Sequence, residues 1–186
     1  VGAVSGLGPA FQPNSWYRKL RLTLIVRVFR LIFDNRKARI ICQSKNDRDV
    51  LVDHGITPSA NVSLIPGSGV DLSKYVFSPL LDGPFIKFLF IGRLLKEKGI
   101  EYYLEAAKNV LDKDYDVKFY IVGEHEKEQK DYIDLEKLNI YLKNDNIIYL
   151  GAVSPDDMPK IIANTSCVVL PSYYREGVPR SLLESA

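Results

Sequence analysis

In the second half of the chain, short apolar runs alternate with longer stretches whose apolar residues recur at helical spacing. Four apolar runs have the length of a strand, and they cover residues 85–91, 117–122, 146–150 and 166–170. Helical spacing or a helix-start signal follows each run, over residues 100–111, about 126–143, from Ser154 and from Pro179. Four such units in succession predict an α/β domain with a parallel sheet covered by helices on both faces. Ligands of such sheets bind where the strands end and the loops begin.

The first 80 residues show the same alternation less regularly. We expect strands at residues 1–5, 38–42 and 62–66, a long helix from Trp16 to about Lys37, and a short helix over residues 46–53. This pattern is typical of the last part of another α/β domain. We therefore assign residues 1–75 to a first domain, with a linker to about residue 83, and residues 84–186 to a second domain.

Composition and charge narrow the class of protein. Of the 186 residues, 46% are apolar and 26% are charged, which excludes a disordered or collagen-like chain. The net charge of +2 argues against a nucleic-acid-binding protein. Positive charge is nevertheless concentrated between Trp16 and Arg39, where there are eight basic residues and one acid. This segment is either a peripheral contact with an anionic membrane or a core helix whose arginines extend to solvent.

The cysteines indicate the compartment of the protein, and the two ends of the sequence bear on whether it is a piece of a longer chain. Cys42 and Cys167 lie in apolar runs, so we expect two buried, reduced thiols in a cytoplasmic protein. The chain opens with no signal peptide, and none of its apolar stretches approaches the ~20 residues of a membrane span. Because it lacks an initial methionine and stops inside a predicted helix, we expect a piece of a longer protein.

The most informative residues follow the fourth predicted strand. Glu176 and Glu184 are separated by seven residues, and Gly177, Val178 and Pro179 lead into the helix between them. Backbone N–H groups at a helix start, together with the helix dipole, suit an anionic phosphate. A carboxylate can accept hydrogen bonds from ribose hydroxyls. The spacing alone is equally consistent with two glutamates that bind no ligand, one of them solvated and the other capping a helix.

A second cluster follows the first of these strands, in the loop Gly92-Arg-Leu-Leu-Lys-Glu-Lys-Gly99. Arg93 and Lys98 bracket this loop at an edge where two cations can hold a diphosphate. An ordinary solvated basic loop has the same composition. The loop is neither a Walker phosphate loop nor a dinucleotide fingerprint, because GxxxxGK[ST] and GxGxxG are both absent. The sequence also contains no His/Cys/Asp cluster with metal-ligand spacing.

Together these segments resemble a known family. The stretches FIGRLLKEKGIEYYLEAA, YIVGE, IIYLGAV and LPSYYREGVPRSLLESA are similar to the carboxyl-terminal nucleotide-binding domain of retaining GT-B glycosyltransferases of family 4 (group 1). The Glu-x7-Glu and Gly-Arg-Leu…Glu-Lys-Gly elements follow the family's order. The resemblance covers about residues 60–186 well and the first 60 loosely. It implies a fragment of the GT-B fold, with a Rossmann-like sheet in a truncated carboxyl-terminal domain and the end of an amino-terminal, acceptor-side domain.

The resemblance also implies roles for particular residues. Arg93 and Lys98 would bind the diphosphate of a nucleotide-sugar and stabilise the leaving UDP or GDP, Glu176 would contact the donor sugar, and Glu184 the ribose. We regard Arg93, Lys98 and Glu176 as catalytic. Other donor-binding residues would be Gly177, Val178, Pro179, Gly123, Glu124, Gly151 and Val153. No metal or other cofactor is expected, since the two cations and a helix dipole take its place.

Two positions depart from the family's pattern. Gly123-Glu124-His125 stands where many members have Gly-Asp-Gly, which leaves recognition of the base open. Gly6 and Gly8 stand where many members have a His-Gly that faces the donor sugar. These two glycines would let the backbone approach the donor, or they form a plain strand-to-helix turn. This variant is similar to the subgroup that acts on polyprenyl-linked or polysaccharide acceptors.

We therefore expect a retaining hexosyltransferase of polysaccharide or lipid-linked glycan biosynthesis. It would move a sugar, from UDP in preference to GDP, onto a glycan or lipid-linked acceptor. We expect it in the cytoplasm or at the cytoplasmic face of the inner membrane, and we expect this piece alone to be inactive. The alternatives are a non-catalytic nucleotide-binding scaffold and a sugar-nucleotide epimerase built on the same two-domain frame.

Overall fold

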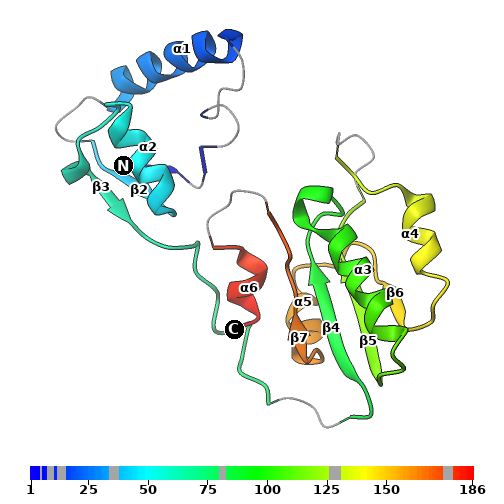
Figure 1. Cartoon of the computed structure of the whole chain (residues 1–186). Helices are drawn as coiled ribbons and strands as arrows, with labels where there is room; N and C mark the ends of the chain where they lie inside the picture. The colour runs from blue at the N-terminus through cyan, green and yellow to red at the C-terminus, as the bar shows by residue number, and fades with distance from the viewer. Residues whose placement is uncertain are drawn as a thin grey trace. The chain divides into compact units, whose positions relative to one another are not determined.

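A computed structural model describes residues 1–4, 6–7, 11, 16–33, 38–79, 83–125, 131–173 and 178–186 (Figure 1). The contacts divide the chain into two compact units. The first is built on Val1–Gly69, with Val178 to Arg180 grouped alongside it. The second is built on residues from Val70 to Tyr173, with Ser181–Ala186. Each unit is an α/β structure and is described by itself.

The second unit contains a four-stranded parallel sheet. Its strands are β4 (Ile86–Ile91), β5 (Val117–Val122), β6 (Ile147–Tyr149) and β7 (Cys167–Val168). They lie in the order β6-β5-β4-β7, so β4 and β5 form the centre. The four predicted strands are therefore confirmed. All four strands point the same way, so the loops that follow them emerge at one edge of the sheet.

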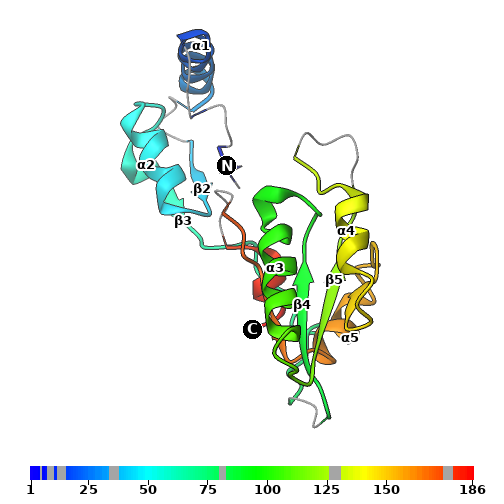
Figure 2. The same ribbon diagram turned by 45° about the vertical axis from the view of Figure 1, so that its right-hand side comes forward.

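Helices cover both faces of this sheet because neighbouring residues of a strand point to opposite sides. In β4, Phe90 packs in a cluster with helix α3, whereas Leu89 packs in a cluster with α5; both side chains are fully buried. Figure 2 shows α3 and α4 beside β4 and β5. The helices of this unit are α3 (Ile100–Leu111), α4 (Leu135–Tyr141), α5 (Met158–Ala163) and, from its second residue on, α6 (Arg180–Glu184), with a 3-10 turn η3 (Lys96–Lys98).

The helix predicted over about residues 126–143 is wrong for residues 131–134. Residues 126–130 lie outside the described residues, and α4 begins only at Leu135, where the side chain of Asp134 accepts a hydrogen bond from the N–H of Glu136. Residues 131–133 instead pair with the loop after β4. The N–H of Lys96 donates to the carbonyl of Asp131 over 2.8 Å, which gives this backbone partners outside a helix.

Helix α5 also begins later than its start signal predicts. Ser154 to Asp157 form a turn, in which the carbonyl of Ser154 accepts the N–H groups of Asp157 and Met158. The α-helix starts at Met158, with Pro159 in its first turn. Serine, proline and acidic residues favour a turn as well as a helix start, so the sequence signal placed the right element three residues too early.

The first unit has a smaller parallel sheet with the order β1-β2-β3. Its core contains Leu22 and Val26 from the long helix, Ile40 and Cys42 from the middle strand, and Leu51 from the short helix. The elements are β1 (Gly2–Val4), α1 (Trp16–Phe33), β2 (Ile40–Cys42), α2 (Lys45–Asp53), η2 (Ser59–Asn61) and β3 (Val62–Leu64). The strands and helices expected in this region are confirmed; Ser5 and residues 34–37, the ends expected for the first strand and the long helix, lie outside the described residues. Within the described part of the chain, no helix has the length and apolar character needed to cross a bilayer.

The two cysteines have different environments. Cys42 is fully buried, as predicted, and burial raises the pKa of its thiol. Cys167 is exposed, so the prediction of two buried thiols is wrong for this residue. The reason is its place in the fold: β7 pairs with β4 on one side only and forms an edge of the described sheet.

Candidate functional site

Three strand ends of the second unit are joined directly to one another. The N–H of Gly92, after β4, donates to the carbonyl of Val122 over 3.0 Å. The N–H of Gly123, after β5, donates to the carbonyl of Gly151 over 3.0 Å. The structure thus brings the predicted residues Gly123 and Gly151 to the same edge as Gly92. The edge continues into the loops, because the N–H of Leu94 donates to the carbonyl of Glu124 over 3.1 Å.

Gly123 lies where two loops approach more closely than a side chain allows. A Cβ atom at this position would overlap the carbonyl oxygen of Gly92. On its other side, the hydroxyl of Tyr149 donates to the carbonyl of Gly123 over 2.9 Å. A glycine at the end of β5 is therefore required by packing, independently of any ligand.

Arg93 and Lys98 belong to a loop whose middle is anchored in the core. Leu94 and Leu95, between them, are buried, and the carbonyl of Leu94 accepts the N–H of Ile133 over 2.9 Å. Arg93 is exposed and Lys98 is half-buried at the end of η3. The apolar anchors hold the backbone that carries both cations, so the loop is not an ordinary mobile surface turn.

The loop after β7 packs against this cationic loop. Gly99 has a φ of +80°, and a Cβ there would overlap the carbonyl of Pro171. The carbonyl of Glu97 accepts two hydrogen bonds from the β7 loop, one from the N–H of Tyr173 (3.1 Å) and one from the hydroxyl of Ser172 (3.3 Å). The stretch that leads to Glu176 therefore starts beside the loop of Arg93 and Lys98, whereas a common pocket for these cations and the two glutamates stays a prediction.

The aromatic residue at this junction has a packing role. The rings of Tyr173 and Tyr102 meet edge to face, with centroids 6.1 Å apart. Tyr102 lies in the first turn of α3, directly after the cationic loop. The contact therefore fixes the β7 loop to the same helix start that η3 leads into.

The remaining predicted donor residues divide into three groups. Glu176, Gly177 and Gly8 lie outside the described residues. Val153 is half-buried and packs against the core cluster of Leu89, Val122 and Met158. Gly6 is exposed after β1, Val178 is exposed and Pro179 is half-buried before α6. Their donor roles stay predictions.

Glu184 is the last residue of α6. It borders a groove of about 770 Å³ whose other lining residues include Lys160, Ser166 and Cys167. Ser166 and Cys167 lie at the beginning of β7, so this groove extends along the strand toward its amino end. The contact of Glu184 with a ribose therefore stays a prediction.

Burial and charge act together on Tyr149 beside Glu124. Burial is the larger cause of a raised pKa for the Tyr149 hydroxyl, and the negative charge of Glu124 raises it further. The protonated hydroxyl is thus favoured, which maintains its hydrogen bond to Gly123. His125, next along the chain, bonds through Nε2 to the carbonyl of Ile133 over 2.8 Å and meets the ring of Tyr132 edge to face. His125 is therefore a structural residue of this loop.

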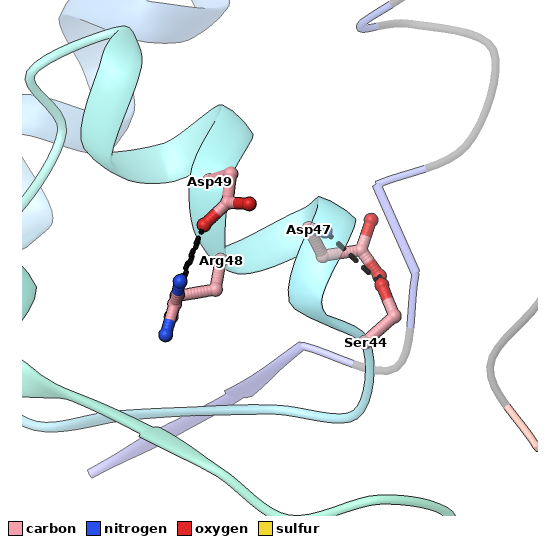
Figure 3. A network of polar contacts seen from close by, with 4 residues as sticks. All are labelled: Ser44, Asp47, Arg48 and Asp49. Atoms are coloured by element: carbon pink, nitrogen blue, oxygen red, sulfur yellow. Dashed lines mark hydrogen bonds and ion pairs between the residues drawn. The ribbon is translucent and has the colours of Figure 1, made fainter.

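A polar network in the first unit was missed by the sequence analysis (Figure 3). Asp47 is only 9% exposed; one carboxylate oxygen accepts the hydroxyl of Ser44 over 2.7 Å and the other accepts the N–H of Leu7 over 3.3 Å. The Ser44 hydroxyl in turn caps α2 by accepting the N–H of Asp47 over 3.0 Å. The sequence Ser-x-x-Asp is a capping-box signal and would have identified this pair. Asp47 therefore positions the loop that contains Gly6.

Among the described residues, no group of three or more His, Cys, Asp or Glu side chains is arranged to hold a metal ion. The cations of the described site, Arg93 and Lys98, are suited to an anionic ligand.

Solved structures show the class of fold. Sucrose-phosphate synthase from Thermosynechococcus elongatus superimposes with a TM-score of 0.69 at 21% identity, over 98% of this chain and 46% of that chain. Anabaena HepE in complex with UDP and glucose gives a TM-score of 0.69 at 16% identity, over 98% of this chain and 49% of that chain. The chain is an α/β protein that corresponds to just under half of a GT-B glycosyltransferase, as predicted.

The sequence comparisons define the family. A family model described as "Glycosyl transferases group 1" matches residues 73–186. The chain belongs to this family.

Two curated relatives, both glycosyltransferases, match parts of this chain. A UDP-Gal:alpha-D-GlcNAc-diphosphoundecaprenol alpha-1,3-galactosyltransferase from Escherichia coli is 30% identical over 161 residues, which are 79% of this chain and 40% of the relative. An alpha-D-kanosaminyltransferase from Streptomyces kanamyceticus is 36% identical over 96 residues, which are 51% of this chain and 23% of the relative. The chain thus spans less than half the length of these relatives.

Proposed function

We propose that the protein is a retaining, metal-independent hexosyltransferase of family 4 that takes its sugar from a nucleoside diphosphate donor, with UDP favoured. One observation carries this proposal: the loop of Arg93 and Lys98 packs directly against the loop after β7, through Gly99 and Pro171. A site for a sugar diphosphate needs these two loops together, because one supplies cations and the other leads to the glutamate-flanked helix start.

The chemistry of glycosyl transfer explains why two cations are needed. Departure of the diphosphate leaves an oxocarbenium-like sugar and adds negative charge to the leaving oxygens. Arg93 and Lys98 would neutralise this charge, in the place that a metal ion has in other transferases. The anchoring of Leu94 and Leu95 in the core supports this role, because cations held in position cost little reorganisation during the reaction.

The other donor contacts follow from the order of the strands. The base and ribose would lie near Gly123, Glu124 and Gly151, whose backbones are joined at the strand ends. Glu176 would contact the sugar, and Glu184 the ribose hydroxyls. The further contacts proposed for the donor are Val153, Gly177, Val178, Pro179, Gly6 and Gly8.

The relatives support UDP and a lipid-linked or polysaccharide acceptor. HepE is described in complex with UDP and glucose, and the Escherichia coli relative is named for UDP-Gal and a diphosphoundecaprenol acceptor. A Staphylococcus aureus relative, 29% identical over 96 residues, is named as a capsular polysaccharide biosynthesis glycosyltransferase. We propose the same classes of donor and acceptor here. The enzyme would work at the cytoplasmic face of a membrane, with residues 16–39 toward the lipid.

The test compares ligands that differ only in phosphate. Isothermal titration of the chain with UDP, UMP and uridine, in buffer containing EDTA, should give the tightest binding for UDP. Loss of the diphosphate should weaken binding by about tenfold or more, since it removes charge-assisted hydrogen bonds. Equal affinities for UDP and uridine would contradict the proposed diphosphate site. Binding that needs added Mg²⁺ would contradict the metal-independent mechanism.

A further inference from the structure

The cationic loop after β4 is paired with a second segment of the chain, residues 131–133. Leu95 of the loop and Tyr132 form an antiparallel bridge. Beside this bridge, the N–H of Ile133 donates to the carbonyl of Leu94 over 2.9 Å. A pairing as short as this one is not stable by itself, so the position of the cationic loop depends on what holds residues 131–133.

The side chain of His125 holds residues 131–133 to the end of β5. Its Nε2 lies 2.8 Å from the carbonyl oxygen of Ile133, and its ring meets the ring of Tyr132 edge to face, with centroids 5.4 Å apart. Because a carbonyl oxygen can only accept, Nε2 carries the proton of this hydrogen bond. His125 therefore fixes the segment through two separate contacts, one polar and one aromatic.

Three hydrogen bonds form a closed cycle that includes the backbone next to Arg93. The N–H of Leu94 donates to the carbonyl of Glu124 over 3.1 Å, and the carbonyl of Leu94 accepts the N–H of Ile133. The carbonyl of Ile133 accepts the Nε2–H of His125, and the peptide bond from His125 back to Glu124 closes the cycle. Two of these bonds join backbone groups that any residue except proline supplies, whereas the third needs a side-chain donor. Removal of that donor opens the cycle.

We propose that His125 is a positioning residue for the donor diphosphate: through Ile133 and Leu94 it holds the backbone that carries Arg93. This inference rests on the proposed function, because it requires that the cationic loop binds the phosphates. His125 touches no ligand atom in this role. It acts through preorganisation, since cations that are already in place lose less conformational freedom when a phosphate binds.

The neighbouring strand ends are held independently of His125. The N–H of Gly123 donates to the carbonyl of Gly151 over 3.0 Å, and the hydroxyl of Tyr149 donates to the carbonyl of Gly123 over 2.9 Å. Neither bond belongs to the cycle, so loss of the His125 donor should weaken phosphate binding and leave nucleoside binding unchanged. A general loss of folding would weaken the binding of both ligands by the same factor.

The experiment titrates UDP and uridine into the unchanged chain and into two variants at position 125. His125→Phe keeps an aromatic ring beside Tyr132 but removes the donor, and it should weaken UDP binding by about tenfold without changing the affinity for uridine. His125→Gln offers an amide N–H in place of Nε2 and should restore most of the UDP affinity. Hydrogen exchange at the amides of Leu94 and Ile133 should accelerate in His125→Phe and slow again in His125→Gln.

His54 provides a matched control in the first unit. It is also half-buried, bonds through Nδ1 to the carbonyl of Val50 over 2.9 Å and meets the ring of Phe11 edge to face. His54→Phe should lower the unfolding temperature to a similar extent as His125→Phe and leave UDP affinity unchanged.

The outcomes separate this proposal from the proposed function. If the unchanged chain prefers UDP to uridine and His125→Phe keeps that preference in full, the positioning role is overturned and the donor site stands. An equal loss of UDP affinity in His54→Phe, or unchanged hydrogen exchange at Leu94 in His125→Phe, overturns the positioning role as well. An unchanged chain that binds UDP no more tightly than uridine overturns the proposed donor site, and the positioning role with it.

Discussion

The α-carbon of Gly99 faces the backbone carbonyl of Pro171, so closely that a methyl group has no room between them. Gly99 ends the loop that carries Arg93 and Lys98, and Pro171 begins the loop that leads to Glu176. Two segments that lie more than 70 residues apart in the sequence therefore share one contact at the edge of the sheet. This contact is the structural basis of the proposed donor site.

Replacement of Gly99 should destabilise the folded protein for two reasons. Gly99→Ala would place a Cβ on the Pro171 carbonyl and would force alanine into a left-handed backbone at φ +80°. We expect the free energy of unfolding to fall by about 2–4 kcal/mol, or the β7 loop to shift and UDP affinity to fall with it. Chemical denaturation and titration with UDP measure the two effects.

Substitutions at two other glycines separate the cost of the left-handed backbone from the cost of the overlap with Pro171. Gly69→Ala has a similar φ of +77° but open space around its Cβ, so it should show the backbone cost of about 1 kcal/mol alone. Gly83→Ala has open space and no such φ, and it should be close to neutral. If Gly99→Ala destabilises no more than Gly69→Ala, the close approach to Pro171 is not a constraint.

The carboxylate of Asp47 should contribute more to the stability of the first unit than the carboxylate of Asp49 does. Asp47→Ala removes acceptors for the Ser44 hydroxyl and the Leu7 N–H, and should lower the free energy of unfolding by about 1–2 kcal/mol. Asp49→Ala removes only a surface ion pair with Arg48, and should cost less than about 0.5 kcal/mol. Hydrogen exchange at the Leu7 amide should accelerate in the Asp47 variant and not in the Asp49 variant. Equal exchange rates in the two variants would show that Asp47 does not hold the loop that contains Gly6.

The ionisation of Tyr149 should depend on Glu124. The folded pKa of Tyr149 lies above its usual value, first because of burial and then because of the Glu124 charge. Its contribution to stability is therefore fully present below the unfolded pKa of about 10 and is lost as the pH rises through the folded pKa. In a ¹³C NMR titration, Glu124→Gln should lower the pKa of Tyr149 part of the way, with Tyr149→Phe used to assign the signal. A tyrosine that titrates at its ordinary value, or a pKa raised by Glu124→Gln, would contradict this relationship.

The sheet of the second unit was predictable because its strands are short apolar runs, three of which end at a glycine, and such runs are a strong local signal. Gly123 illustrates this: the requirement for glycine comes from the neighbouring strand end, yet it is visible in the sequence. The start of α4 was not predictable, because residues 131–133 have apolar spacing compatible with a helix but form backbone hydrogen bonds with the β4 loop. Exposure of Cys167 likewise depends on which strands flank β7 and not on its apolar neighbours.

The residues of the candidate site stay predictions from the sequence, and the structure adds the contact between two of its loops. Arg93, Lys98 and the β7 loop were identified by type and order, whereas the carbonyl of Glu97 that joins them has no sequence signal. Tyr149 was missed because its hydrogen bond is to a backbone carbonyl. A backbone partner places no requirement on residue type, so no pattern could point to it.

The central claim is that Arg93 and Lys98 hold a diphosphate, and UDP affinity of three single variants tests it most directly. Arg93→Ala and Lys98→Ala should each weaken UDP binding by about 10- to 100-fold, since each removes a charge-assisted hydrogen bond to phosphate. Lys96→Ala, an exposed cation of the same loop, should bind UDP like the unchanged chain. The three variants should unfold at similar temperatures, and their affinities for uridine should be equal. Equal UDP affinity in all three would contradict the proposed donor site.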